Sequence, residues 1–129
     1  MRTNCLIIVL ILMITGVISA DVSAQEAIRA VIKKCETMED VKISVIRNKD
    51  KATKKVTQVI TDVSFKNNEA LSKEILAAFE KDKDKSDQEI EEWAGGRLKE
   101  MFYRFGSSYY TFSQKEDGSC TLTAVESEK

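Results

Sequence analysis

The stretch EKDKDKSDQE places oxygen-bearing side chains at alternating positions, as a calcium-binding loop does. The residues that match the first three ligand positions of such a loop are Asp82, Asp84 and Ser86. The sixth position, where the loop needs glycine for a sharp turn, is Asp87, and the twelfth, where it needs a bidentate carboxylate, is Trp93. Because the pattern fails at these two positions, we predict a solvated connection between two helices and no metal site.

The sequence contains no histidine. It therefore lacks the usual general base at neutral pH and the commonest zinc ligand, which excludes serine–histidine and cysteine–histidine nucleophiles. The pair Gly95–Gly96 is not followed by the lysine and hydroxyl residue of a phosphate-binding loop. A hydrolase built on two carboxylates stays open, because its acids can lie far apart in the chain. With no distinctive motif, we predict a protein that is not an enzyme and holds no cofactor.

An unusual concentration of aromatic residues lies between Phe102 and Phe112. If this segment forms a hairpin, one face of it is core, and the other face brings together Phe102, Arg104 and Tyr109. An arginine beside two aromatic rings on a sheet surface is typical of a recognition patch. Two other interpretations stay open: a short helix with Trp93 covers the trio, or Arg104 only packs on the ring of Tyr109.

These side chains must be positioned by helices and strands whose patterns are legible in the sequence. Helical spacing of apolar residues predicts helices over residues 25–36 and 67–82, the second capped by asparagine. A capping box formed by Ser86 and Glu89, with Gly95 as terminator, predicts a short helix over residues 86–94.

Runs rich in β-branched and aromatic residues predict five strands. Their ranges are 41–47, 56–65, 98–105, 107–114 and 119–125. In the second strand Val59 and Ile60 break the alternation, and a bulge there would reconcile the two faces. The order helix, two strands, helix, short helix, three strands predicts an α+β domain, with an antiparallel sheet and helices packed on one of its faces.

The two turns after residue 105 fix the expected register of the last three strands. A two-residue turn that begins at Gly106 pairs Tyr103 with Tyr110. A three-residue turn with Gly118 as the bulge residue sets Leu122 beside Phe112, whereas a two-residue turn would place Leu122 on the wrong face.

The first 24 residues have the layout of a secretory signal peptide, with one arginine, an apolar run and small residues. Cleavage after Ala24 fits best and cleavage after Ala20 is the alternative, which leaves one domain over residues 25–129. The apolar run is shorter than the roughly twenty residues that span a bilayer, so we predict no stable membrane span after cleavage. We therefore expect the protein outside the cytoplasm, where Cys35 and Cys120 can form a disulfide.

The charges balance closely, with 20 basic and 21 acidic residues and a net charge of −1. This balance gives no reason to expect nucleic acid or an anionic membrane as a partner.

The segments IKKCETMEDVKISVIRNK and FYRFGSSYYTFS resemble a family of small secreted Bacteroidales proteins that carry a domain of unknown function. The resemblance extends over the mature chain and implies a periplasmic or secreted α+β domain, with no known catalytic residues. We therefore predict a module that binds a protein or envelope component through Phe102, Arg104 and Tyr109. The alternatives are a structural or stress-related envelope protein without a dedicated site, and the carboxylate hydrolase.

Overall fold

The computed structural model describes residues 25–127 as a six-stranded sheet with two α-helices. The elements in chain order are α3 (Glu26–Cys35), β1 (Lys42–Lys49), β2 (Val56–Lys66), α4 (Glu69–Asp82), the 3-10 turn η1 (Lys83–Lys85), β3 (Gln88–Ala94), β4 (Arg97–Phe105), β5 (Ser108–Gln114) and β6 (Ser119–Ser127). The expected signal peptide and both expected cleavage points lie outside the described residues.

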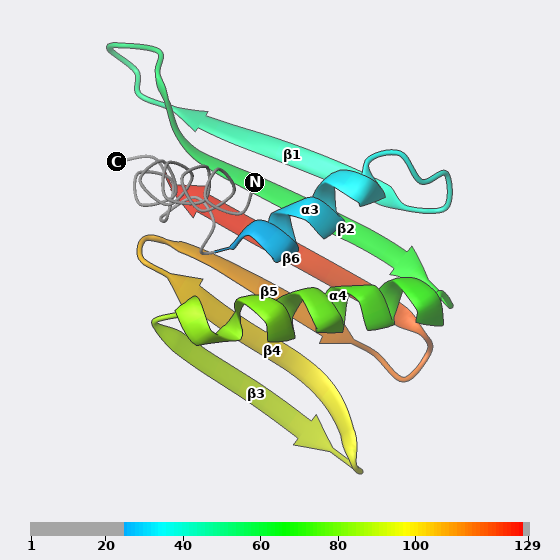
Figure 1. Ribbon diagram of the computed structural model, residues 1–129. Coiled ribbons are helices and arrows are strands. Elements are labelled where there is room, and N and C mark those ends of the chain that lie inside the picture. The colour runs from blue at the N-terminus through cyan, green and yellow to red at the C-terminus, as the bar shows by residue number, and fades with distance from the viewer. Residues whose placement is uncertain (1–24, 128–129) are drawn as a thin grey trace, which may run out of the picture.

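The strands lie in the order β1-β2-β6-β5-β4-β3, and every neighbouring pair is antiparallel. The chain builds the β1–β2 hairpin, crosses along α4 to the far edge of the sheet, and returns through β3 to β6 (Figure 1). The pairing of β6 with β2 therefore closes the sheet between segments that are far apart in the sequence. This arrangement confirms the expected α+β class with an antiparallel sheet.

Both helices lie over the same side of the sheet, where they cover its middle strands (Figure 1). The edge strand β3 is exposed along its whole length, and β1 is exposed at all but one position. The expectation of helices packed on one face therefore describes the centre of the sheet and not its edges.

The predicted short helix over residues 86–94 is wrong, because this segment is the edge strand β3. Ser86 has extended backbone angles, and its hydroxyl donates to the carbonyl of Lys83 instead of capping a following helix. Gly95 and Gly96 both have positive φ angles and form a tight turn into β4. The sheet therefore has six strands, because tertiary pairing with β4 overrides the local capping pattern.

The registers predicted for the last three strands are confirmed. Tyr103 pairs with Tyr110, and Phe112 pairs with Leu122. The bulge expected at Val59 and Ile60 is wrong, because β2 runs through both residues in regular register with β1 and β6. The two side chains consequently point to opposite faces of the sheet.

The core lies between the helices and the sheet. Phe79 of α4 is fully buried, and its ring meets Tyr103 edge-on at a centroid distance of 5.2 Å and Phe112 at 6.4 Å. The N-terminus of α4 is capped as expected, because the Asn68 side chain accepts a hydrogen bond from the Leu71 amide at 3.0 Å.

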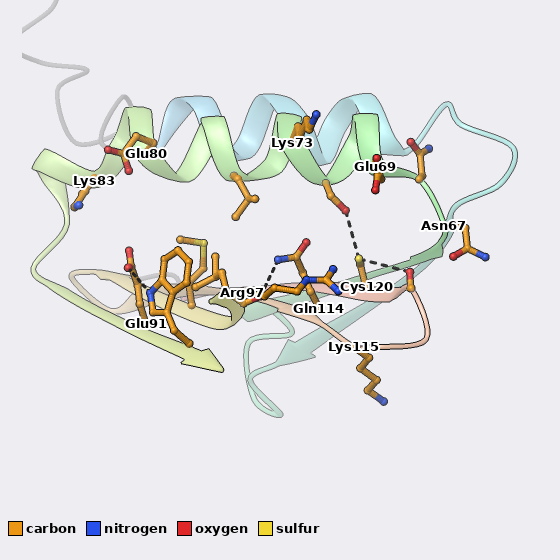
Figure 2. A pocket seen from close by; sticks show the side chains of 17 residues that line it. Asn67, Glu69, Lys73, Glu80, Lys83, Glu91, Arg97, Gln114, Lys115 and Cys120 are labelled. Carbon is orange, nitrogen blue, oxygen red and sulfur yellow. Dashed lines mark hydrogen bonds between the residues drawn. The ribbon is translucent and has the colours of Figure 1, made fainter. Parts of the chain in front are cut away.

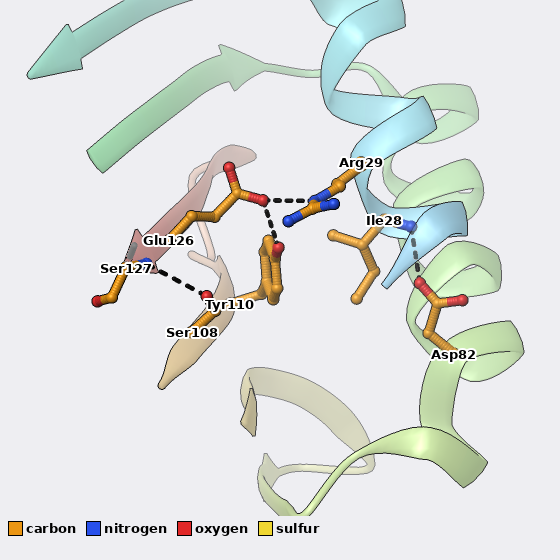
Figure 3. Close-up of polar contacts among 7 residues, drawn as sticks. All are labelled: Ile28, Arg29, Asp82, Ser108, Tyr110, Glu126 and Ser127. Atoms are coloured by element: carbon orange, nitrogen blue, oxygen red, sulfur yellow. Dashed lines mark hydrogen bonds and ion pairs between the residues drawn. The ribbon is translucent and has the colours of Figure 1, made fainter. Parts of the chain in front are cut away.

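Two carboxylates fasten α3 to the rest of the molecule (Figure 3). Asp82, buried at the end of α4, accepts hydrogen bonds from the first-turn amides of α3, at 2.9 Å from Ile28 and 3.3 Å from Ala27. Glu126 of β6 accepts from Arg29 at 2.7 Å and from the Tyr110 hydroxyl at 2.6 Å. Residues distant in the sequence thus satisfy the start of α3, whose own N-cap side chain makes no capping bond.

The structure contains no disulfide between Cys35 and Cys120, although the sequence predicts one. Both residues are free thiols, and both are buried. The Cys120 sulfur lies 3.4 Å from the hydroxyl of Ser72, which belongs to α4, whereas Cys35 is the last residue of α3. Burial raises the pKa of the Cys35 thiol, and the nearby Glu74 carboxylate raises it further, so the reactive thiolate is disfavoured there.

Candidate functional site

The three residues predicted to bind a partner lie on the face of the sheet that the helices leave open. Arg104 of β4 pairs directly with Tyr109 of β5, and both side chains are exposed. The Phe102 ring lies 5.3 Å from the Tyr109 ring, centroid to centroid. The structure therefore brings the trio together, and the segment that was expected to cover it is instead a coplanar neighbour of β4.

Apolar side chains continue from this trio across the whole open face. Directly paired residues share a face of the sheet, and the pairing runs from Tyr109 to Val125, Ile60 and Ile46 in one direction. On the other side Phe102 pairs with Ile90. We call these six residues the open-face stripe: Ile46, Ile60, Val125, Tyr109, Phe102 and Ile90.

The stripe is exposed mainly where it crosses the outer strands. Ile46 is 49 % exposed, Ile90 is 47 % exposed and Tyr109 is 37 % exposed, whereas Val125 is buried between its neighbours. Hydroxyl side chains border the stripe, and Thr123 donates to Asp62 at 2.7 Å. Together with Arg104 and Asp62, the border carries both signs of charge. An apolar centre with a mixed polar rim is the composition of a protein interface.

A groove of about 730 Å³ lies on the helix side of the sheet, between α4 and the β3–β4 hairpin. Figure 2 shows its two walls, with Lys73 and Glu80 on the helix and Arg97 and Glu91 on the sheet. Its apolar lining is formed by Leu76, Trp93, Leu98 and Met101. The volume lies within the range of small-ligand pockets, which is about 300–1,000 Å³.

Two features of the sheet wall shape this groove. The pairing of β3 with β4 shifts between Glu92 and Trp93, so Leu98 lies buried on the same face as Met101 although the two are three residues apart. Glu91 accepts hydrogen bonds from the Trp93 indole at 3.2 Å and from the Tyr103 hydroxyl at 3.5 Å. Trp93 lines the groove and is 61 % exposed, so its indole is accessible from solvent while it is bonded to Glu91.

The acidic residues of the groove do not have the environment of a catalytic pair. Glu80 and Glu91 lie on opposite walls (Figure 2), but both are exposed. A carboxylate hydrolase needs one acid kept protonated, usually by burial. Among residues 25–127, no group of three or more acidic or cysteine side chains is arranged to hold a metal ion.

The groove was missed at the level of the sequence, and one signal could have found it. Residues 88–94 are followed by the pair Gly95–Gly96 and then by a strand pattern, and a two-glycine turn before a strand is typical of a hairpin. A strand there would have placed Trp93 beside the helix predicted over residues 67–82. The capping box in the same residues instead predicts a short helix.

No helix in the part of the chain that the structure describes has the length and apolar character to cross a membrane.

Comparison with known proteins gives one match. Residues 25–128 match the family described as Domain of unknown function (DUF5024). Neither the curated proteins nor the solved structures contain a match.

Proposed function

The chain belongs to the DUF5024 family of domains of unknown function, and from that premise we propose that it is a non-enzymatic module that binds a protein partner through the open face of its sheet. The observation that carries this proposal is the open-face stripe, an apolar band across all six strands that neither α3 nor α4 covers. The site of action is outside the cytoplasm, on the strength of the expected signal peptide.

A flat face favours a protein as the occupant over a small molecule. Small ligands bind in concave sites that bury most of their surface, whereas the stripe crosses neighbouring strands of one sheet. Exposed tyrosine and arginine side chains are the types that contribute most to protein interfaces. Arg104 and Tyr109 lie side by side at the end of β4 and the start of β5, on two inner strands of the sheet, and they form the expected centre of the contact.

The test is recovery of a partner by the tagged mature protein from its native envelope fraction. We expect Tyr109→Ala and Arg104→Ala each to reduce the recovered partner about tenfold, because a central interface residue contributes more than about 1 kcal/mol. Arg97→Ala is the matched control, because Arg97 lies on the same strand and lines the groove instead. Circular dichroism melts of all three variants check that the fold is retained.

Two results would contradict the proposal. Equal recovery by wild-type protein and both open-face variants would show that the stripe does not bind the partner. Sedimentation velocity gives the second check, because a dimer that Tyr109→Ala dissociates would identify a second copy of this chain as the occupant.

A further inference from the structure

We propose that the groove between α4 and the β3–β4 hairpin binds a fatty acid, with its carboxylate at Arg97 and Lys73 and its chain along the apolar lining. This site lies on the opposite side of the sheet from the open-face stripe, so it is a second binding site, independent of the proposed function. The inference rests on the cations of the groove, on its apolar lining and on the exposed tryptophan that lines it.

The cations at this site lack partners of their own. Lys73 and Arg97 lie on facing walls (Figure 2), and the side chain of neither forms an ion pair with a described residue. An arginine with an open guanidinium fork is suited to a carboxylate, which it can bind through two parallel hydrogen bonds.

The carboxylates of the groove are distributed unevenly. Glu80 and Glu91 lie at the same end of the groove as Lys83, away from Glu69 (Figure 2). Glu91 is already bonded to the Trp93 indole and the Tyr103 hydroxyl. Glu69 is the acidic side chain at the cationic end, one turn before Lys73 on α4 and on the opposite wall from Arg97 (Figure 2). The balance there favours an anionic head group.

The apolar lining lies between α4 and the β3–β4 hairpin. Leu98 and Met101 are buried at its floor, Leu76 of α4 is half-buried, and Trp93 is exposed on β3, where it pairs with Leu98. An exposed tryptophan beside a half-open apolar channel leaves a large surface that a chain of methylene groups would cover, at about 0.8 kcal/mol for each methylene buried. A carboxylate head and an apolar tail therefore match the cations and the apolar lining of the groove.

The test uses Trp93 itself, since it is the only tryptophan of the chain. Dodecanoate, kept below its micelle concentration, is titrated into the full mature protein while tryptophan emission is recorded. We expect a saturable blue shift, as the chain removes the indole from water. Isothermal calorimetry of the same titration gives the affinity without relying on fluorescence.

The variants separate this site from the other face of the sheet. Arg97→Gln and Lys73→Gln should each weaken dodecanoate binding at least about tenfold, because the head group loses a charged partner. Arg104→Gln is the matched control on the same strand, and it should bind dodecanoate as the wild type does. Normal partner recovery by Arg104→Gln, with dodecanoate binding weakened in Arg97→Gln, would count against the proposed function alone. Reduced partner recovery by Arg104→Gln, with dodecanoate binding unchanged in Arg97→Gln and Lys73→Gln, would count against this site alone.

Three outcomes would overturn the assignment. The first is the absence of a saturable response to dodecanoate. The second is equal binding of dodecyltrimethylammonium, which has the same chain with a cationic head. The third is tighter binding of an apolar hexapeptide with a free C-terminal carboxylate, which would identify a protein C-terminus as the occupant.

Discussion

At the scale of single residues, the most consequential side chain is Asp82. The sequence places it in a charge run, where a carboxylate is usually solvated, yet it is 4 % exposed and accepts two hydrogen bonds from the first turn of α3. A carboxylate at a helix N-terminus satisfies amides that have no partner within the helix and interacts favourably with the helix dipole. Asp82 therefore joins the end of α4 to the start of α3.

Asp82→Ala should lower the free energy of unfolding by about 1–2 kcal/mol, the usual cost of losing a cap. Asp82→Asn is the matched control, because its side-chain oxygen can still accept one of the two bonds, and it should lose less. Urea denaturation monitored by circular dichroism measures both. Equal stability of the alanine variant and the wild type would show that water replaces the carboxylate without cost.

The same residue predicts a pH dependence. Burial raises the pKa of the Asp82 carboxyl above its ordinary value, and this effect outweighs the two backbone hydrogen bonds, which lower it. The folded state thus binds the proton more tightly than the unfolded state, so stability increases as the pH falls through the raised pKa. The stability of the wild type relative to Asp82→Asn should therefore rise between pH 7 and about pH 4. A decrease in this relative stability as the pH falls over the same interval would contradict the prediction.

At the scale of elements, the β3–β4 hairpin decides where both candidate sites lie. Its outer strand supplies Ile90 to the open-face stripe and Trp93 to the groove. Side chains alternate between the two faces along a strand, so residues three positions apart point to opposite faces. The turn that makes this possible consists of Gly95 and Gly96, at φ angles of 60° and 76°. Such angles are costly for most residues with a Cβ atom.

Gly96→Val should destabilise the hairpin by about 1–2 kcal/mol, because valine is strained at a positive φ. The space around this glycine is open, so the effect comes from the backbone and not from a clash. Gly95→Asn is the control, because asparagine is favoured in such turns. Both are measured by urea denaturation. A valine variant as stable as the wild type would show that the turn does not depend on glycine at position 96.

At the scale of the whole molecule, the sheet separates two surfaces of different chemistry. The helix side has a groove with an apolar lining and unpaired cations, and the open side has a flat apolar stripe with a mixed border. Residues of the single strand β4 contribute to both, which is why Arg97 and Arg104 serve as controls for one another. The two free thiols lie within the core between the layers.

Without reductant, the denatured mature protein should take up two alkyl groups, because Cys35 and Cys120 are free in the folded state. Intact-mass analysis counts these groups and also identifies the N-terminal residue, which tests the expected cleavage after Ala24. If the protein takes up no alkyl group until a reductant is added, Cys35 and Cys120 form the disulfide that the sequence predicts.

Much of the fold was predictable from local patterns. The helices over residues 26–35 and 69–82 follow apolar spacing, and the registers of the last strands follow from Gly106 and Gly118. The candidate trio was also predictable, since alternation along β4 and β5 determines which side chains share a face. The segment from Ser86 to Ala94 was not, because its capping box favours a helix whereas the Gly95–Gly96 pair that follows favours a hairpin.

The sequence by itself determined the α+β class, the absence of histidine chemistry and the grouping of Phe102, Arg104 and Tyr109, because these depend on composition and on short-range periodicity. Only the tertiary structure decided that β3 is a strand, that Asp82 caps a helix more than fifty residues away, and that Trp93 and Arg97 line a common groove. The physical reason is that strand pairing and burial join residues distant in the chain, and their free energy outweighs local preferences.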